Sequence, residues 1–227
     1  PITAATICDV MNMIGACVVS GGVRRSSQIF LGQATEEFLG LKDQSALQAL
    51  RAGPMSEEVL SKIAQHPMTT HRWASNNSVF AHFGMNYSEV ADRIAHNGEP
   101  GLIWLDDMVR PYGRLSDPAD WKDNEAEGAN PCSEQALFND ETCNLVELFM
   151  PNHESLEDWM ATIKPAFLYG KAMTLADIHD PKVDEVCKRN RRIGLSITGV
   201  GAMYDRLGHR ELSRWLDAGY KEVLRLD

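Results

Sequence analysis

Apolar residues recur at helical spacing along much of the chain and alternate, or run together, over shorter stretches. The helical spacing predicts helices over residues 4–17, 35–50, 56–65, 87–97, 156–178, 183–190, 200–207 and 211–226. The shorter runs predict strands over residues 76–83, 101–104, 143–148 and 192–198, and a loop from Val23 leads into a further strand that ends at Leu31. Strands separated by helices are typical of an α/β layer or barrel.

A long polar connection interrupts this pattern. Residues 106–128 are rich in Asp, Pro and Gly, which predicts a surface loop. A small extended segment is predicted after it, over residues 129–137. Asn139-Asp140 then marks a turn before the next strand.

The composition is that of an ordinary globular protein. The chain has 227 residues, 44% of them hydrophobic, enough for one large domain or two small ones. Its formal net charge of −10 disfavours a nucleic-acid partner, because proteins that grip a nucleic-acid backbone present a basic face. No apolar run reaches the roughly 18 to 20 residues that span a bilayer, and no signal segment opens the chain, so we expect a cytoplasmic protein.

Both ends fall inside helical patterns. The chain opens at Pro1 without an initiator Met, and it stops at Asp227 without a helix-ending signal. We therefore expect residues 1–227 to be part of a single, larger domain.

The cysteines predict reduced thiols. They are Cys8, Cys17, Cys132, Cys143 and Cys187. An odd number without any Cys-x-x-Cys pair argues against a disulfide framework or a four-cysteine zinc site. A cytosolic enzyme with catalytic thiols fits better. His66, His71 and His82 lack the spacing of metal ligands, so we expect no metal site.

The segment Asn130-Pro131-Cys132-Ser133-Glu134 places three chemically useful side chains at alternate positions. Pro131 disfavours a helical Asn130 and so favours an extended chain. Alternate residues of an extended chain face the same side about 6 to 7 Å apart, so an amide, a thiol and a carboxylate would project together. The alternative is a turn with a structural cysteine, since free cysteines are often small apolar fillers. The spacing alone does not separate the two.

A second thiol, Cys143, follows eleven residues after Cys132. The turn predicted at Asn139-Asp140 allows the chain to double back and bring the two sulfurs together. The spacing permits this approach without requiring it.

Four stretches, in this order, resemble motifs of the catalytic subunit of ribonucleotide reductases. Residues 15–27 resemble the family's specificity loop with the helix before it, and residues 72–79 its Ser-Asn-Asn-Ser segment. Residues 130–134, followed by Cys143-Asn144-Leu145, are similar to the active-site segment, and residues 190–195 to the Asn-Arg-Arg-Ile-Gly strand. The likeness spans about residues 4–205. It is closest to the monomeric, adenosylcobalamin-dependent type, which reduces ribonucleoside triphosphates.

The resemblance implies a fold and a reaction. The fold would be a ten-stranded α/β barrel, with a central finger loop that carries the radical cysteine. Cys132 would be the thiyl radical that removes the 3′ hydrogen of the ribose. Glu134 would be the general base for the 3′-hydroxyl, and Asn130 would hold a ribose hydroxyl. Cys143 would be one of two thiols that supply reducing equivalents and end as a disulfide.

The resemblance also implies binding partners. Adenosylcobalamin would be the cofactor, a ribonucleoside triphosphate the substrate, and thioredoxin or a similar dithiol the reductant. A specificity loop would relay the identity of a bound deoxynucleotide effector to the substrate base; it comprises Gly21, Gly22, Val23, Arg24, Arg25 and Ser26. Glycines permit close approach to a ligand, and arginine forks bind phosphate or base edges. The alternative is a surface turn with two solvated arginines.

The chain departs from a complete enzyme of this family. Cys8 and Cys17 lie in the helix before the specificity loop and are expected to pack there, so neither fits the family's second reducing thiol. The C-terminal cysteine pair and the downstream phosphate-binding loop are also absent. We expect the isolated piece to be inactive.

Three further functions stay open on the sequence. Within the family, the chain could belong to a large subunit that receives its radical from a separate metal-containing subunit. A cysteine acyl-transfer enzyme could instead pair Cys132 with a histidine such as His153. The non-enzymatic possibility is a nucleotide-binding regulatory module.

Overall fold

The computed structural model describes residues 1–20, 26–112 and 123–227, and the chain divides into two compact units. The first unit comprises Pro1–Pro111 with Ala126–Ala136, and the second Tyr112–Glu125 with Leu137–Asp227. Each has its own hydrophobic core. Helices alternate with strands in both, which confirms the α/β class. A single domain that forms part of a ten-stranded barrel stays a prediction.

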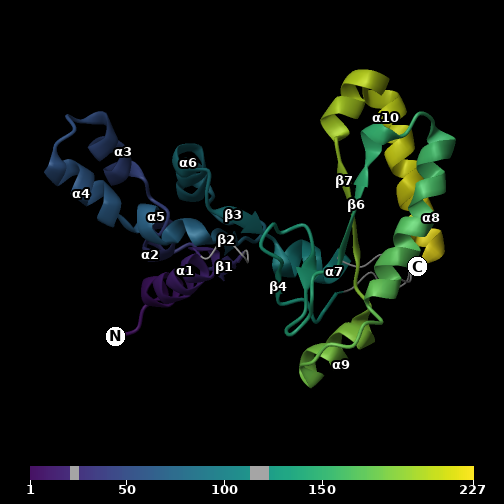
Figure 1. Ribbon diagram of the computed structural model, residues 1–227, viewed down its shortest axis with the longest axis horizontal. Coiled ribbons are helices and arrows are strands. Elements are labelled where there is room, and N and C mark those ends of the chain that lie inside the picture. The colour runs from purple at the N-terminus through teal and green to yellow at the C-terminus, as the bar shows by residue number, and fades with distance from the viewer. Residues whose placement is uncertain (21–25, 113–122) are drawn as a thin grey trace. The chain divides into compact units, whose positions relative to one another are not determined.

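A parallel sheet with the strand order β1-β2-β3 forms the centre of the first unit (Figure 1). The strands are β1 (Ile29–Gly32), β2 (Asn76–Phe80) and β3 (Gly101–Ile103). Ile29 pairs with Asn76, and Ser78 with Gly101. Parallel neighbours need long crossover connections, and helices supply them here. They are α2 (Glu36–Gly40), α3 (Ser45–Ala52), α4 (Glu57–Gln65), α5 (Pro67–Thr70) and the 3₁₀ turn η1 (Arg72–Ala74) before β2, and α6 (Ser88–Asn97) before β3.

Local signals set the ends of these helices. The Ser56 hydroxyl accepts the Val59 N–H at 3.2 Å and caps α4, as a serine before two glutamates predicts. Gly98 ends α6 in the left-handed region, with φ of 76°. The helix predicted over residues 35–50 is wrong in one respect: it is broken into α2 and α3. Asp43 accepts the Ser45 N–H at 2.8 Å, and this side-chain bond competes with helical backbone bonding at the break.

Helix α1 (Ala4–Ser20) packs against the sheet and α2. Cys8 is buried with Phe38 and Val79, so its predicted packing role is confirmed. Cys17, on the same helix, is exposed and does not follow that prediction. Gly15 lies close to the end of the Gln28 side chain, which donates to the Met11 carbonyl at 3.0 Å; a Cβ at Gly15 would lie 2.2 Å from Nε2 of Gln28 and would displace it.

The second unit has two parallel strands, β6 (Leu145–Phe149) and β7 (Gly194–Thr198), paired from Leu145 with Gly194 to Phe149 with Thr198. Helices α8 (Leu156–Met173) and α9 (Pro181–Asn190) connect them, and α10 (Val200–Leu226) follows. Figure 1 shows α8 and α10 side by side along the strands. Gly208, with φ of 73° and ψ of 165°, breaks α10 between the two helices that the sequence predicts there.

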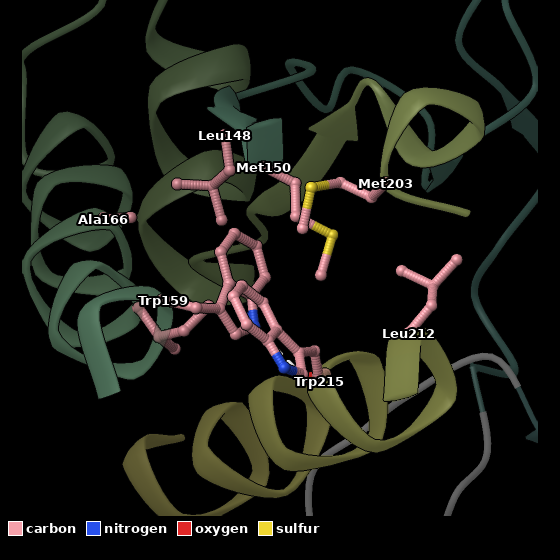
Figure 2. Close-up of a cluster of buried hydrophobic side chains, with 8 residues drawn as sticks. Leu148, Met150, Trp159, Ala166, Met203, Leu212 and Trp215 are labelled. Carbon is pink, nitrogen blue, oxygen red and sulfur yellow. Dashed lines mark hydrogen bonds between the residues drawn. The ribbon is translucent and has the colours of Figure 1, made fainter. Parts of the chain in front are cut away.

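Large side chains from these elements converge in the core of the second unit (Figure 2). Trp159 of α8 is 1% exposed, and its indole N–H donates to the Trp215 carbonyl at 3.1 Å. Met150 and Met203 fill the space beside them and are fully buried. This packing holds α8 and α10 against β6. The residues just before β6 are therefore attached to a rigid part of the second unit.

The remaining elements are short. They are the π-helical turn η2 (Leu105–Val109), α7 (Arg110–Tyr112), β4 (Gly128–Ala129), β5 (Ala136–Leu137) and the 3₁₀ turn η3 (Met150–Asn152). Strands β4 and β5 form a two-stranded sheet. The segment between them contains Cys132.

Candidate active site

Residues 130–135 form a closed turn rather than an extended segment. The Asn130 N–H donates to the Gln135 carbonyl at 3.0 Å, and the Ser133 N–H donates to the Asn130 carbonyl at 2.8 Å. Ser133 has φ of 63°, in the left-handed region. The prediction of an extended chain over residues 129–137 is therefore wrong for residues 130–135, whereas Ala129, Ala136 and Leu137 lie in the short strands β4 and β5. Pro131 excludes a helical Asn130, as expected, but the positive φ at Ser133 then reverses the chain.

The turn nevertheless brings two of the predicted site residues together. Nδ2 of Asn130 donates to Oε1 of Glu134 at 2.5 Å. Oδ1 of Asn130 accepts the Gln135 N–H at 3.1 Å, so both ends of the amide are engaged. Asn130 is 4% exposed, whereas Glu134 is exposed. A buried amide thus fixes the direction of a carboxylate that solvent, or a ligand, can reach.

Cys132 lies in the same turn and is exposed. The carbonyl of the residue before it, Pro131, accepts a hydrogen bond from Nδ2 of Asn76 at 2.6 Å. Asn76 is the first residue of β2, and its own N–H donates to the Gln28 carbonyl at 2.8 Å. The turn with the thiol is therefore anchored to the central strand of the first unit. The alternative of a packed structural cysteine does not hold for Cys132.

Cys143 lies in the second unit and is exposed. It follows a turn at Asn139-Asp140, where Asp140 has φ of 61°, so the turn predicted there is confirmed. The predicted approach of its sulfur to that of Cys132 stays a prediction, because the two thiols belong to different units.

An ion network fixes the residues before Cys143. The Arg192 guanidinium donates to both carboxylate oxygens of Asp123, at 2.7 and 3.0 Å, and its Nε donates to Glu141 at 2.9 Å. The side chains of Asp123 and Glu141 are 3% and 1% exposed. Burial by itself would lower the pKa of Arg192, but the hydrogen bonds that it donates to both carboxylates outweigh burial and raise that pKa. The arginine therefore stays charged.

The specificity loop can be described only at its end. Gly21, Gly22, Val23, Arg24 and Arg25 lie outside the described residues. Ser26 is half-buried and leads into β1. The effector role of the loop stays a prediction.

A cavity of about 240 Å³ lies beside the turn, lined by Ser133 and by apolar side chains of β3 and η2. A cavity of about 620 Å³ lies in the second unit, with cations at one end. Those cations already have partners: Lys171 pairs with Asp227, Arg189 with Glu125, and Arg191 donates to Thr174. The charged groups described around the larger cavity are therefore engaged within the protein.

Within the described ranges, no group of three or more His, Cys, Asp or Glu side chains could hold a metal ion. None of the helices described is long and apolar enough to cross a membrane.

Two anchoring residues were not assigned roles from the sequence. Asn76 and Arg192 both lie in motifs that resemble segments of the reductases, and this resemblance could have identified them as candidates. Their contacts join residues that are 55, 51 and 69 positions apart in the chain. Local pattern does not reveal contacts at such separation.

Comparison with known proteins shows which proteins the chain resembles along its whole length. No family model matches the chain. The chain is 43% identical over 229 aligned positions to the probable adenosylcobalamin-dependent ribonucleoside-triphosphate reductase of Dictyostelium discoideum. It is 41% identical over 228 positions to the adenosylcobalamin-dependent ribonucleoside-triphosphate reductase of Euglena gracilis. Both alignments cover 100% of this chain. The chain is therefore similar over its whole length to adenosylcobalamin-dependent ribonucleotide reductases.

A solved structure agrees with this likeness. The crystal structure of a B-12 dependent (class II) ribonucleotide reductase matches 92% of the chain with a TM-score of 0.66 and 32% identity. The chain covers 26% of that protein, and 28% and 29% of the Dictyostelium and Euglena reductases. It thus spans little more than a quarter of its relatives, and the activity of the complete protein is a separate inference.

Proposed function

We propose that the complete protein reduces ribonucleoside triphosphates to deoxyribonucleotides by thiyl-radical chemistry, and that this chain carries the turn where the ribose reacts. The observation that supports the proposal most directly is the contact of Asn130 with Glu134 in a turn that exposes Cys132. The names of the Dictyostelium and Euglena relatives support the substrate class.

Three residues of the turn, Cys132, Glu134 and Asn130, each have one task in this mechanism. The Cys132 sulfur, as a thiyl radical, takes the hydrogen from C3′ of the ribose and returns it at the end of the cycle. Glu134 accepts the 3′-hydroxyl proton, which requires an ionised carboxylate within hydrogen-bond reach. Asn130 holds a ribose hydroxyl; its amide is already oriented by Gln135 and Glu134, so little ordering is needed when substrate binds.

The net reaction is a two-electron reduction at the ribose 2′ carbon. The C2′–O bond breaks, a hydrogen replaces the hydroxyl, and the oxygen leaves as water. Two thiols supply the two electrons and two hydrogens and end as a disulfide, and we assign Cys143 to one of them. Thioredoxin or a similar dithiol then reduces the disulfide for the next turnover.

Adenosylcobalamin, named for the relatives, supplies the initiating radical when bound to the complete protein. The described residues do not identify the surface that would hold it: a cobalamin brings its own cobalt, so a cluster of metal-ligating side chains is not required, and the charged groups around the larger cavity already have partners. No residue of this chain is therefore assigned to holding the cofactor.

The remaining parts of the proposal rest on the family. The loop of residues 21–26 binds or senses a deoxynucleotide effector, and the turn with Cys132 is the finger loop of a ten-stranded barrel. The enzyme works in the cytoplasm without a nucleic-acid partner, in line with the net charge of −10.

His153 argues against a cysteine acyl-transfer enzyme. It is 8% exposed, Nδ1 lies 3.2 Å from the Met150 carbonyl, and Nε2 lies 2.8 Å from the Thr162 hydroxyl. Its ring also packs edge-on against Trp159. Both nitrogens are engaged within the second unit, so this histidine has no ring nitrogen left to activate a thiol.

The decisive test uses the full-length protein and its Cys132→Ser variant. With adenosylcobalamin, a ribonucleoside triphosphate, an effector and a dithiol, the wild type is expected to form deoxynucleotide without a second subunit. The variant should bind nucleotide as the wild type does, yet form no measurable product. Product from the variant would reject the role of Cys132.

The same assay distinguishes a two-subunit reductase and a regulatory module from the proposed enzyme. Wild-type activity that requires an added iron protein would favour the two-subunit reductase. Effector binding without turnover under any of these conditions would favour the regulatory module.

A further inference from the structure

Two side chains, Cys187 on α9 and Arg192 just after it, hold the segment that carries Cys143. Glu141, two residues before the thiol, accepts from Arg192 at 2.9 Å and from the Phe138 N–H at 2.7 Å. Thr142 donates its N–H to the buried sulfur of Cys187 at 3.3 Å, and its hydroxyl lies 3.1 Å from the same atom. Both residues that precede Cys143 are therefore fixed to the second unit.

The residue after the thiol is held as well. Nδ2 of Asn144 lies 3.2 Å from the Thr142 hydroxyl and 3.5 Å from the Arg192 carbonyl. The Asn144 carbonyl accepts the Gly194 N–H at 2.9 Å, where β7 begins. Cys143 itself is exposed. The structure thus presents an exposed thiol on a backbone whose neighbours are bound on both sides.

Arg192 makes two of these contacts, one through its side chain and one through its backbone carbonyl. The two terminal nitrogens of its planar guanidinium donate to Asp123, and Nε donates to Glu141. Its backbone carbonyl lies 3.5 Å from Nδ2 of Asn144. A lysine ammonium is a single point charge and cannot span both carboxylates in this way. The arginine is 11% exposed, and its partners are more deeply buried, so solvent cannot replace these bonds.

We propose that Arg192 is a positioning residue for the reducing thiol, acting through Glu141 to hold the Cys143 segment in the geometry that delivers hydrogen and electrons to the substrate. This inference rests on the proposed function. Arg192 touches no reacting atom in it. A displacement of the thiol by about 1 Å is enough to slow such a step by about 100-fold, because the reacting atoms must meet in a narrow range of geometry.

The test separates the thiol step from the radical step in the full-length protein. The radical step is followed by isotope exchange at the substrate 3′ carbon, which needs Cys132. The thiol step is followed by the deoxynucleotide formed in a single turnover by pre-reduced protein without added dithiol. Arg192→Lys should retain exchange within about 2-fold and lose about 10-fold to 100-fold in the single-turnover rate. The KM for substrate should stay unchanged.

Two variants serve as references. Cys143→Ser should abolish the single-turnover product and so marks the complete loss of the thiol step. Lys188→Gln removes a cation from α9 that pairs only with Asp177 and Asp184 in the described contacts, and it should leave both rates unchanged. If Arg192→Lys fails to fold, Glu141→Gln decides by the same ratio, because it removes, at nearly constant volume, the carboxylate charge that Nε of Arg192 contacts.

The outcomes are distinct. A selective loss of the thiol step supports the positioning role. Unchanged rates, or an equal fall of exchange and single-turnover product, would overturn it. Failure of the proposed function looks different, since the wild type would then show neither exchange nor product, or Cys143→Ser would still form product in a single turnover.

Discussion

The side-chain amide of Asn130 donates to the carboxylate of Glu134 at 2.5 Å, across the turn that exposes Cys132. The two residues lie four positions apart, and the reversal of the chain at Ser133 brings them together. A hydrogen bond to an ionised carboxylate is stronger than one between neutral groups. The pair therefore holds the carboxylate in a set direction beside the thiol.

Replacing Glu134 by Gln in the full-length protein should lower kcat by about 100-fold to 10,000-fold, the usual contribution of a general base. The glutamine oxygen can still accept from Asn130, so the turn and the KM for substrate should change little. Steady-state deoxynucleotide formation measures both constants. Glu127→Gln, an exposed carboxylate outside the turn, is the matched control. A Glu134→Gln variant with kcat within about 3-fold of the wild type would contradict the assignment.

Removing the side-chain amide of Asn76 should loosen the turn without unfolding the protein. Asn76→Ala loses the bond to the Pro131 carbonyl, and Asn76→Asp replaces the donor by an acceptor that repels the same carbonyl. Because Asn76 is exposed, the unfolding temperature should stay nearly constant. We expect kcat/KM to fall by about 10-fold to 100-fold, and further for Asp than for Ala. Equal activity of both variants and the wild type would show that the turn needs no such anchor.

Truncating Trp159 should lower the unfolding free energy of the protein, and the loss should be larger for Ala than for Phe. Trp159→Ala removes one of the two tryptophan side chains of the cluster and should cost about 3 to 5 kcal/mol of unfolding free energy. Trp159→Phe loses the bond to the Trp215 carbonyl and part of the volume, so its cost should be smaller. Denaturant unfolding of the two variants measures the difference. Equal costs would mean that the indole is not packed as Figure 2 shows.

Lowering the pH should reduce the folding stability of the first unit, because Asp9 becomes protonated. Hydrogen bonds from Arg72, and then from His71, hold the pKa of Asp9 below its ordinary value of 3.8. A carboxyl with a lowered native pKa adds stability above its unfolded pKa and loses it as pH falls through the native one. Asp9→Asn should therefore destabilise the protein by a constant amount from about pH 7 to pH 5, and the difference should shrink below about pH 4.

Unfolding midpoints between about pH 7 and pH 3 test this window. Asp217→Asn provides the control, since Asp217 is 59% exposed and pairs only with the exposed Lys221 in the described contacts. A stability difference for Asp9→Asn that stays constant down to about pH 3 would contradict the ion pair with Arg72.

Much of the architecture could be predicted from local pattern. The strands predicted over residues 143–148 and 192–198 correspond to β6 and β7, and Gly98 and Gly208 end or break helices as glycine commonly does. The family likeness predicted from four ordered motifs is confirmed by relatives that align with the whole chain. These features depend on neighbouring residues or on the sequence itself, so no tertiary contact is needed to find them.

The geometry of the candidate site could not be predicted in the same way. Pro131 excludes helix in the preceding residue, but an extended strand and a turn both satisfy it. The turn prevails in the structure, with Ser133 in the left-handed region and the Pro131 carbonyl held by Asn76 from β2. That choice depends on a contact between residues 55 positions apart.

The sequence by itself determined the likeness to ribonucleotide reductases, the α/β class and the candidate thiols and carboxylate. Only the tertiary structure decided that Asn130 meets Glu134 across a turn, that Asn76 anchors this turn, and that Arg192 binds the segment before Cys143. The physical reason is the range of the interactions. Periodicity and backbone preference act over a few neighbouring residues, whereas hydrogen bonds and buried ion pairs between distant segments form only when packing has brought those segments together.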